Sequence, residues 1–264
     1  MQVEFVAATQ PRIPDLSSQE FTAYIARIGR VKSNPERLLK YLIEHAHWSP
    51  FEHTFLTFKI STSRAMGREL LRHRSFTFQE LSQRYEKILS SEPVELRRQS
   101  ETNRQSSTTV FDPLIADRIV NSSTANSLSC DTNAEQLRPA SACIADHLQA
   151  TWNLYQKLIE AGVARECARA ILPECTTTTI LMTGSLRSWI HFFAIRDHEL
   201  AQKEIQEVAR AIRRIFTEQF PVIAQAIAPT ATTVDREGAT TPIVAEQELV
   251  INRAATVANT FTGE

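Results

Sequence analysis

The fold is decided by residues 54–85, TFLTFKISTSRAMGRELLRHRSFTFQELSQRY. The first part of this stretch places Leu56, Phe58 and Ile60 on one side of an extended chain and polar residues on the other, which predicts a strand. Residues 64–74 change to helical spacing, and the two phenylalanines in SFTFQE then fit the inward face of another extended segment. This close succession favours mixed α+β packing over a regular βαβ repeat.

The rest of the chain shows the same mixture of patterns. Ser17 and Glu20 have the spacing of a capping box, and Asn34 precedes a proline, so helices are expected to begin at both places. Apolar periodicity predicts helices over 17–29, 34–45, 143–162, 163–173, 185–197 and 201–221, and strands over 2–6 and 176–184. The predicted class is α+β, with mixed helices and an antiparallel-type sheet in a single domain of residues 1–228.

The composition is that of an ordinary globular protein, because 42% of the 264 residues are hydrophobic and 22% are charged. The formal net charge of -1 provides no overall basic field for nucleic acid or acidic membranes, so anion binding must be local. No apolar run approaches the ~18 residues of a membrane span, and the N-terminus lacks the order of a signal peptide. We therefore expect a cytoplasmic protein. The four cysteines lack CxxC spacing, which favours reduced thiols over disulfides or a metal site.

Two segments lack this periodicity. Residues 97–136 are rich in Ser, Thr and Asn, which predicts a long, mobile surface insertion. Residues 229–264 are mostly aperiodic and rich in Ala and Thr, which predicts a flexible C-terminal tail. Little chemistry is expected from the insertion.

Cations concentrate in the quoted stretch, although the whole chain is nearly neutral. On a helix Arg64, Arg68 and Arg72 share one face, where like charges repel unless something compensates them. No acidic residue interleaves on that face, and Ser82 and Arg84 follow with further donors suited to phosphate oxygens. The pattern predicts an anion clamp, with a solvated charged helix as the plainer alternative.

Side chains, rather than a glycine-rich loop, would have to hold the phosphates. Neither GxGxxG nor GxxxxGK[ST] occurs in the sequence, so the chain carries no Rossmann fingerprint and no Walker loop. GxSxG and HExxH are absent as well. Because no general base is visible for Ser82, phosphate binding by its hydroxyl is expected rather than nucleophilic catalysis.

The cation-rich stretch resembles the signature of the flavin-dependent thymidylate synthases, which runs Arg-His-Arg, two residues, Ser, one residue, Asn-Glu, one residue, Ser, one residue, Arg-Tyr. The residues that carry the resemblance are Arg72-His73-Arg74, Gln79-Glu80, Ser82 and Arg84-Tyr85. Residues 47–53, 162–173 and 187–202 extend it. Thr77 replaces the first Ser of the signature and Gln79 replaces the Asn, and both substitutes can still form hydrogen bonds.

The resemblance implies reductive methylation of dUMP to dTMP. Methylenetetrahydrofolate would give the carbon, and FAD reduced by NADPH would give the hydride. The resemblance also implies a homotetramer whose active sites are shared between subunits. Two phosphorylated ligands, FAD and dUMP, would then explain why the cations concentrate in one stretch.

The resemblance also implies which residues contact each ligand. For FAD these are Ser49, Arg72, His73, Arg74, Glu80, Ser185, Arg187 and His191. For dUMP they are Glu69, Arg72, Glu80, Leu81, Ser82, Gln83, Arg84, Arg169 and Arg196. Ser185 stands where relatives have Asn, and Glu69 where some have Gln. A structural salt bridge with Glu166 or Glu174 is the alternative for Arg169.

Arg196 is the expected catalytic residue. It follows Trp189, Phe192 and Phe193 at helical spacing, so its guanidinium ends an apolar stripe and should be partly buried. A buried cation needs a partner, and an ion pair with Asp197 or Glu199 is the structural alternative. The resemblance implies that Arg196 favours ionisation of the uracil N3 and so makes C5 nucleophilic.

Two other functions stay open. One is a related flavin- and folate-dependent enzyme that acts on another pyrimidine nucleotide. The other is a nucleic-acid-binding module that uses the arginines and phenylalanines, with binding that falls steeply as salt rises. The near-neutral charge argues against the second.

Overall fold

A computed structural model describes residues 1–30, 34–87, 90–117, 136–228, 233–234 and 240–241. Its centre is a four-stranded antiparallel sheet with the strand order β1-β2-β8-β3. The strands are β1 (Gln2–Ala8), β2 (Phe55–Ser63), β8 (Thr177–Ser185) and β3 (Phe76–Glu80). Helices and an antiparallel sheet in one unit confirm the α+β prediction.

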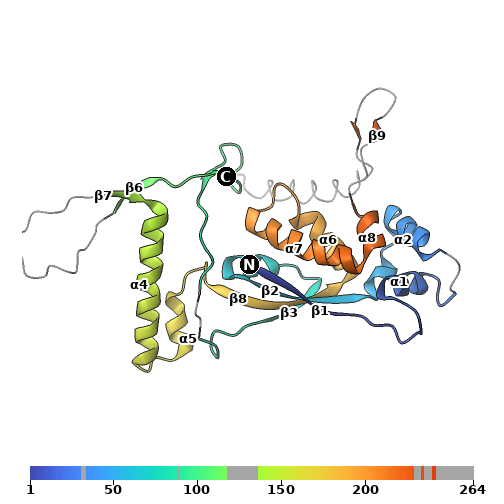
Figure 1. Ribbon diagram of the computed structural model, residues 1–264, viewed down its shortest axis with the longest axis horizontal. Helices are drawn as coiled ribbons and strands as arrows, with labels where there is room; N and C mark the ends of the chain where they lie inside the picture. Colours follow the sequence, from blue (N-terminus) through green and yellow to red (C-terminus); the bar gives the residue numbers. More distant parts are fainter. Residues whose placement is uncertain (31–33, 88–89, 118–135, 229–232, 235–239, 242–264) are drawn as a thin grey trace, which may run out of the picture.

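One face of the sheet is apolar and forms the core. Leu56, Phe58 and Ile60 of β2 are fully buried, as are Ile180 and Met182 of β8, so the alternation read from the sequence is confirmed. Each buried side chain of this size stabilises the fold by roughly 1.5–3 kcal/mol. Figure 1 shows three helices over this face: α6 (Leu186–Arg196), α7 (Lys203–Gln219) and α8 (Pro221–Ala226).

Two N-terminal helices pack at one end of the sheet (Figure 1). Helix α1 (Ser18–Ala26) begins with the predicted capping box of Ser17 and Glu20. Helix α2 (Pro35–Glu44) begins at Asn34, whose side chain accepts a hydrogen bond from the Arg37 backbone. Both expected helix starts are therefore confirmed.

Helix α3 (Arg64–Leu70) is shorter than the sequence indicates. The expectation of a helix over 64–74 is wrong, because the chain turns after Leu70 and Phe76 begins to pair with Gly184 of β8. Sheet pairing thus overrides the local helical spacing. Arg72 lies beyond the helix, so it does not share a helical face with Arg64 and Arg68.

An arm formed by α4 (Ala140–Glu160) and α5 (Arg165–Ala168) lies to one side of the sheet (Figure 1). The described part of the 97–136 insertion is not wholly irregular, because it forms short antiparallel pairs. These are β4 (Arg97–Gln99) with β5 (Ser107–Val110), and β6 (Leu114–Asp117) with β7 (Gln136–Pro139). Arg97 anchors this part, since its side chain is only 10% exposed and its guanidinium binds Glu95 and Glu204 at 2.8 and 2.5 Å. Residues 118–135 lie outside the described chain.

The expected tail over 229–264 lies outside the described residues except for a short pair, β9 (Thr233–Val234) with β10 (Thr240–Thr241). Cys143, Cys167 and Cys175 are free thiols, while Cys130 lies outside the described chain. A search of the described helices finds none with the length and apolar character needed to cross a membrane.

Candidate active site

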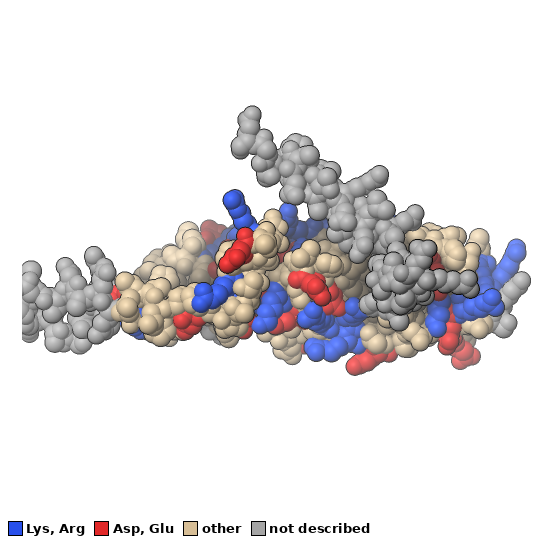
Figure 2. Space-filling view, turned by 90° about the horizontal axis from the view of Figure 1, so that it is seen from above, with Lys and Arg blue, Asp and Glu red and all other residues tan. Residues whose placement is uncertain are grey.

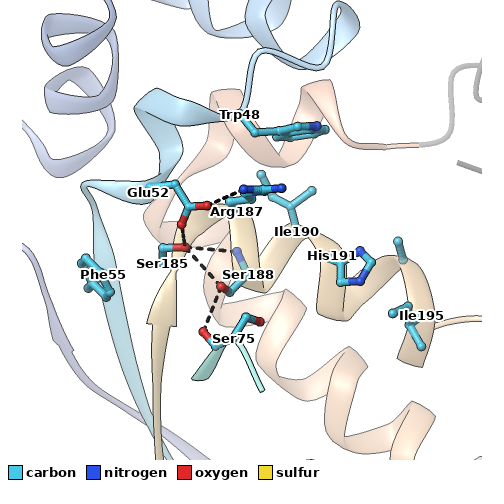
Figure 3. Close-up of a pocket in the computed structure, with 11 residues that line it drawn as sticks. Trp48, Glu52, Phe55, Ser75, Ser185, Arg187, Ser188, Ile190, His191 and Ile195 are labelled. Atoms are coloured by element: carbon cyan, nitrogen blue, oxygen red, sulfur yellow. Dashed lines mark hydrogen bonds and ion pairs between the residues drawn. The ribbon is translucent and has the colours of Figure 1, made fainter. Parts of the chain in front are cut away.

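A pocket of about 650 Å³ opens where β8 passes into α6 (Figure 3). Three other segments complete its wall: the short helix η1 (Ser49–Glu52), the start of β2, and the turn before β3. A volume of this size is typical of a small-molecule site. The lining residues are Trp48, Glu52, Phe55, Ser75, Ser185, Arg187, Ser188, Ile190, His191, Ala194 and Ile195.

The junction of β8 and α6 aims polar side chains into this pocket. Ser185 is both the last residue of β8 and the N-cap of α6, since its Oγ accepts a hydrogen bond from the Ser188 backbone at 3.3 Å. Arg187 and His191 then lie one turn apart on α6 and both line the pocket. Three residues expected to contact a flavin, Ser185, Arg187 and His191, are thereby brought together.

A hydrogen-bond network crosses the pocket floor (Figure 3). Ser185 donates to one carboxylate oxygen of Glu52 at 2.8 Å, and Arg187 donates to the other at 2.6 Å. The Ser188 hydroxyl donates to the carbonyl oxygen of Ser75 at 3.1 Å. The network fixes η1, α6 and the turn before β3 against one another.

The charges of the pocket are set by these contacts. Burial opposes ionisation of Glu52, but hydrogen bonds from Arg187 and Ser185 outweigh it and lower the pKa of that carboxyl. Burial, followed by the charge of Arg187, lowers the pKa of His191. A neutral imidazole, a paired guanidinium and the apolar surfaces of Trp48 and Ile190 therefore face the cavity.

A second cluster forms at the C-terminal end of α6, next to the pocket residue Ile195. Arg196 donates from Nε to Nε2 of His73 at 2.9 Å and from Nη1 to Oε2 of Glu69 at 2.9 Å. The partner of Arg196 is thus Glu69, and the alternative of a pair with Asp197 or Glu199 is wrong. Asp197 instead binds Arg210 and Arg213, each at 2.8 Å.

Three more of the expected flavin contacts lie around these two clusters, whereas Glu80 lies at the far end of β3. Ser49 is exposed at the start of η1, between the pocket residues Trp48 and Glu52. Arg72 and Arg74 are exposed in the turn that carries His73 and Ser75, and neither makes an ion pair within the described chain.

Acidic partners do exist for the other arginines. Arg64 lies 3.5 Å from Glu80, and Arg68 forms an ion pair with Glu174 at 2.9 Å. The expectation that no acidic residue pairs with this arginine set is wrong, because both partners come from other strands or loops. An anion clamp of Arg64, Arg68 and Arg72 is therefore not formed.

The residues expected to bind dUMP gather mostly at the other end of β3. Glu80 accepts a hydrogen bond from Thr178 at 2.7 Å, and Arg84 binds Glu166 of α5 at 3.2 Å. Ser82 opens the turn that contains Arg84. Leu81 lies at the same end of β3, and its backbone N–H donates to the carbonyl oxygen of Thr179. Gln83 follows and is buried, with no partner for Nε2 among the described residues.

Arg169 begins the short helix η2 (Arg169–Ile171), which follows directly on α5. The alternative of a salt bridge from Arg169 to Glu166 or Glu174 is not realised, because these carboxylates bind Arg84 and Arg68. Most of the dUMP set thus lies beside α5, and most of the flavin set lies beside α6. The exceptions are Glu69, Arg72 and Arg196 of the dUMP set, which lie at the α6 end, and Glu80 of the flavin set, which lies at the α5 end.

Most members of the two sets are separated within one chain. Phe76 pairs with Gly184 next to the pocket, while Glu80 pairs with Ile180. At about 3.3 Å per residue, these ends of β3 lie roughly 13 Å apart. A single chain therefore does not gather all the expected site residues into one cavity.

Sequence reasoning missed Glu52, Ser188 and Ser75, which build the pocket floor. Glu52 lies in the HWSPFEH segment, so an acid inside a proline-containing turn was an available signal. Ser188 follows the N-cap Ser185 by three positions, where a side chain faces the same helix end. The contact of Ser188 with Ser75 is long-range and has no local signal.

A mainly apolar pocket with a few polar groups and with arginines beside it is of the kind that binds phosphorylated cofactors and nucleotides. Residues 7–222 match the profile of the family described as "Thymidylate synthase complementing protein", and the chain belongs to this family. It is 38% identical over 234 residues to the flavin-dependent thymidylate synthase of Synechocystis sp., a match that covers 86% of this chain and 99% of the relative.

Two further relatives give the same result. A protein of Paramecium bursaria Chlorella virus 1, named probable flavin-dependent thymidylate synthase, is 37% identical over 86% of this chain and 99% of its own length. The flavin-dependent thymidylate synthase of Kosmotoga olearia is 33% identical over 89% of this chain and 96% of its own length.

Proposed function

We propose that this protein catalyses the reductive methylation of dUMP to dTMP, with methylenetetrahydrofolate as carbon donor. The observation that carries the proposal is the pocket at the junction of β8 and α6, where Ser185, Arg187 and His191 converge next to the Arg196 cluster. These are the positions that match flavin contacts and the catalytic arginine of the family.

The pocket fits part of an FAD molecule. Trp48, Ile190 and Ile195 offer apolar surface to a ring system, while Ser185, Arg187 and His191 offer polar groups to its edge. Ser49, His73 and Glu80 complete the proposed set together with Arg72 and Arg74. The guanidinium groups of these two arginines have no ion-pair partner among the described residues, and they suit phosphate oxygens. When bound and reduced by NADPH, FAD supplies the hydride.

The nucleotide would be held mainly by the second set of residues. Arg84 provides a forked donor for the phosphate of dUMP, and Arg169 provides another cation nearby. The set also includes Glu69, Arg72, Glu80, Leu81, Ser82, Gln83 and Arg196. Arg196 would stabilise negative charge that develops on the uracil ring, which lowers the barrier because the donor is already in place.

We infer that the active form is a homotetramer. The separation of the two sets along β3 supports this, since a second copy would bring one set to the other. The sheet face that points away from α6 and α7 also supports assembly, because it leaves apolar side chains exposed to a second copy. There Phe55 and Leu181 are 47% and 37% exposed, and hydroxyl pairs join Thr57 to Thr183 and Ser61 to Thr179.

Residues 1–228 would form the catalytic unit, with 97–136 as an insertion and 229–264 as a tail. The family match over residues 7–222 supports this division. A cytoplasmic location stays a prediction from the sequence.

A nucleic-acid-binding module has less support. Figure 2 shows Lys and Arg side chains mixed with Asp and Glu over the visible face, without a continuous basic stripe. Arg64, Arg68 and Arg84 are moreover paired with carboxylates. A backbone-binding surface needs unpaired cations along one face.

Product analysis tests the proposed function. Purified protein with FAD, NADPH, methylenetetrahydrofolate and dUMP should form dTMP, and omission of FAD or the folate should abolish the product. Other pyrimidine nucleotides in place of dUMP should give no methylated product. A folded, FAD-loaded protein that methylates one of them but not dUMP would contradict the proposal.

A further inference from the structure

Glu69 lies on a helix that packs closely against the central sheet. Its helix, α3, buries Met66 and Leu70 in the core. A Cβ at Gly67 would lie 3.1 Å from Ile180 Cδ1 and 3.3 Å from Thr178 Cγ2, so the absence of a side chain lets α3 approach β8 closely. The carboxylate of Glu69 is therefore presented from a fixed backbone.

Arg196 is held from two sides. Glu69 binds Nη1 and His73 binds Nε, each at 2.9 Å, so the guanidinium plane is defined by two contacts. Because arginine only donates, His73 must accept through an unprotonated Nε2 and carry its proton on Nδ1. Phe76 and Phe192 fix the imidazole ring by edge contacts, with centroids 6.1 and 5.1 Å away.

This arrangement leaves part of the guanidinium free. Nη2 and the second proton of Nη1 have no hydrogen-bond partner within the described chain. The side chains of Arg196 and Glu69 are only 21% and 28% exposed, against 68% and 53% for the pair of Arg68 and Glu174. Arg196 is therefore a long side chain held in one orientation at a partly desolvated position, and an electrostatic catalyst requires both properties.

We infer that Glu69 is a positioning residue for Arg196: together with His73 it orients the guanidinium so that its free N–H groups face the reacting nucleotide. The inference rests on the proposed function, and it replaces the direct nucleotide contact expected for Glu69. The carboxylate is already occupied by Arg196, so its effect on the reaction passes through that residue. A neutral side chain of the same shape that still accepts this hydrogen bond would orient Arg196 equally well.

A double-mutant cycle tests this role. Glu69→Ala should lower turnover by about tenfold or more, since misplacement of a catalytic group is costly, while the dissociation constant of dUMP changes by less than about twofold. Glu69→Gln keeps an acceptor oxygen and should retain at least about a third of wild-type turnover. In the Arg196→Lys background, Glu69→Ala should cause no further loss, because the group it positions has gone.

Glu174→Ala is the matched control. It removes the ion pair of Arg68, which also lies on α3, and its side chain is 53% exposed. Within the described chain its ion-pair partner is Arg68, which is not among the proposed site residues, so turnover should stay at the wild-type value. A dUMP dissociation constant that rises tenfold with unchanged turnover would overturn the inference and restore Glu69 as a direct contact. The inference would also be overturned if the losses of turnover caused by Glu69→Ala and by Arg196→Lys multiplied in the variant that carries both substitutions.

The failure of the proposed function would look different. In that case wild-type protein and Glu174→Ala would both form no dTMP, whatever stands at position 69. If circular dichroism shows that Glu69→Ala does not fold, the turnover of Glu69→Gln tests the inference instead. A folded, FAD-binding Glu69→Gln protein with tenfold lower turnover would overturn the role of the acceptor oxygen.

Discussion

His73 is held as a neutral imidazole between α3 and α6. Burial is the main cause, and with the neighbouring charges of Arg196 and His191 it lowers the pKa of His73 from 6.5 to about 4. The neutral ring can accept the hydrogen bond from Arg196. Protonation would remove that acceptor and place two cations side by side.

The depressed pKa of His73 makes stability depend on pH. Between pH 6.5 and about 4 the unfolded chain binds a proton that folded His73 does not, so the free energy of unfolding should fall as the pH is lowered through this range. Urea denaturation at pH 7 and pH 5 measures the change. His73→Gln keeps an acceptor and should lose part of the dependence, whereas His147→Gln, at an exposed position on α4, should keep all of it. Equal slopes for the wild type and His73→Gln would rule out this role.

At the scale of elements, strand β8 and helix α6 act as one unit that carries the pocket. Gly184 precedes the N-cap Ser185 and pairs with Phe76 of β3. A Cβ at Gly184 would lie 2.4 Å from the Phe76 ring, so the ring fills the space above the glycine. Trp189 packs edge-on against the same ring at 4.7 Å. The glycine thus lets β3, β8 and α6 meet closely.

Gly184→Ala should destabilise the fold by about 1–3 kcal/mol, the usual cost of overpacking a core. The added methyl would push Phe76 away and loosen the pairing of β3 with β8. Urea denaturation measures the loss. Thr183→Ser is the control, because it lies on the opposite face and keeps the hydroxyl that meets Thr57, so a change within about 0.5 kcal/mol is expected. An unchanged free energy of unfolding for Gly184→Ala would mean that Phe76 moves aside without cost.

The sequence predicted most elements because their signals are local. Alternation in TFLTFKIST and the capping box of Ser17 and Glu20 depend on neighbours a few residues apart, and both are confirmed. The end of α3 was misjudged because its cause is distant: Phe76 pairs with Gly184, far along the chain. The helical spacing of the sequence continues past Leu70, but the helix ends there because the following residues pair with the sheet.

The candidate site was predictable in its parts but not in its pairings. The positions of Arg187 and His191 on one helix followed from their spacing. Ion pairs such as Glu69 with Arg196, or Arg84 with Glu166, join segments that are distant in sequence, and no periodicity encodes them. The burial that sets the pKa of His73 likewise depends on the assembled core.

At the scale of the whole molecule, the important feature is that most of the proposed dUMP contacts lie apart from most of the proposed flavin contacts. The pocket of Arg187 and His191 is at one end of β3, and Arg84 with its partner Glu166 is at the other. A symmetric assembly can place the first set of one copy against the second set of another. Each site would then need two chains.

Mixing two inactive variants tests this arrangement. Arg187→Ala disables the first set and Arg84→Ala the second, so neither homo-oligomer should form dTMP efficiently. Subunit exchange between them should restore up to about a quarter of wild-type activity, because random assembly pairs two intact sets at that frequency. Light scattering of the wild type should give the mass of a tetramer. A fully active monomer, or no recovery after proven exchange, would contradict a shared site.

The most direct test of the central claim is titration of the purified protein with FAD, followed by absorbance and calorimetry. The claim is that the pocket at the junction of β8 and α6 binds a flavin, so wild-type protein should bind FAD stoichiometrically or be purified yellow. Arg187→Ala should weaken binding by about tenfold or more, since it removes a cation from the pocket wall. Arg213→Ala, which removes a cation of α7 outside the pocket, should bind FAD like the wild type. A folded wild-type protein that binds no FAD would contradict the claim.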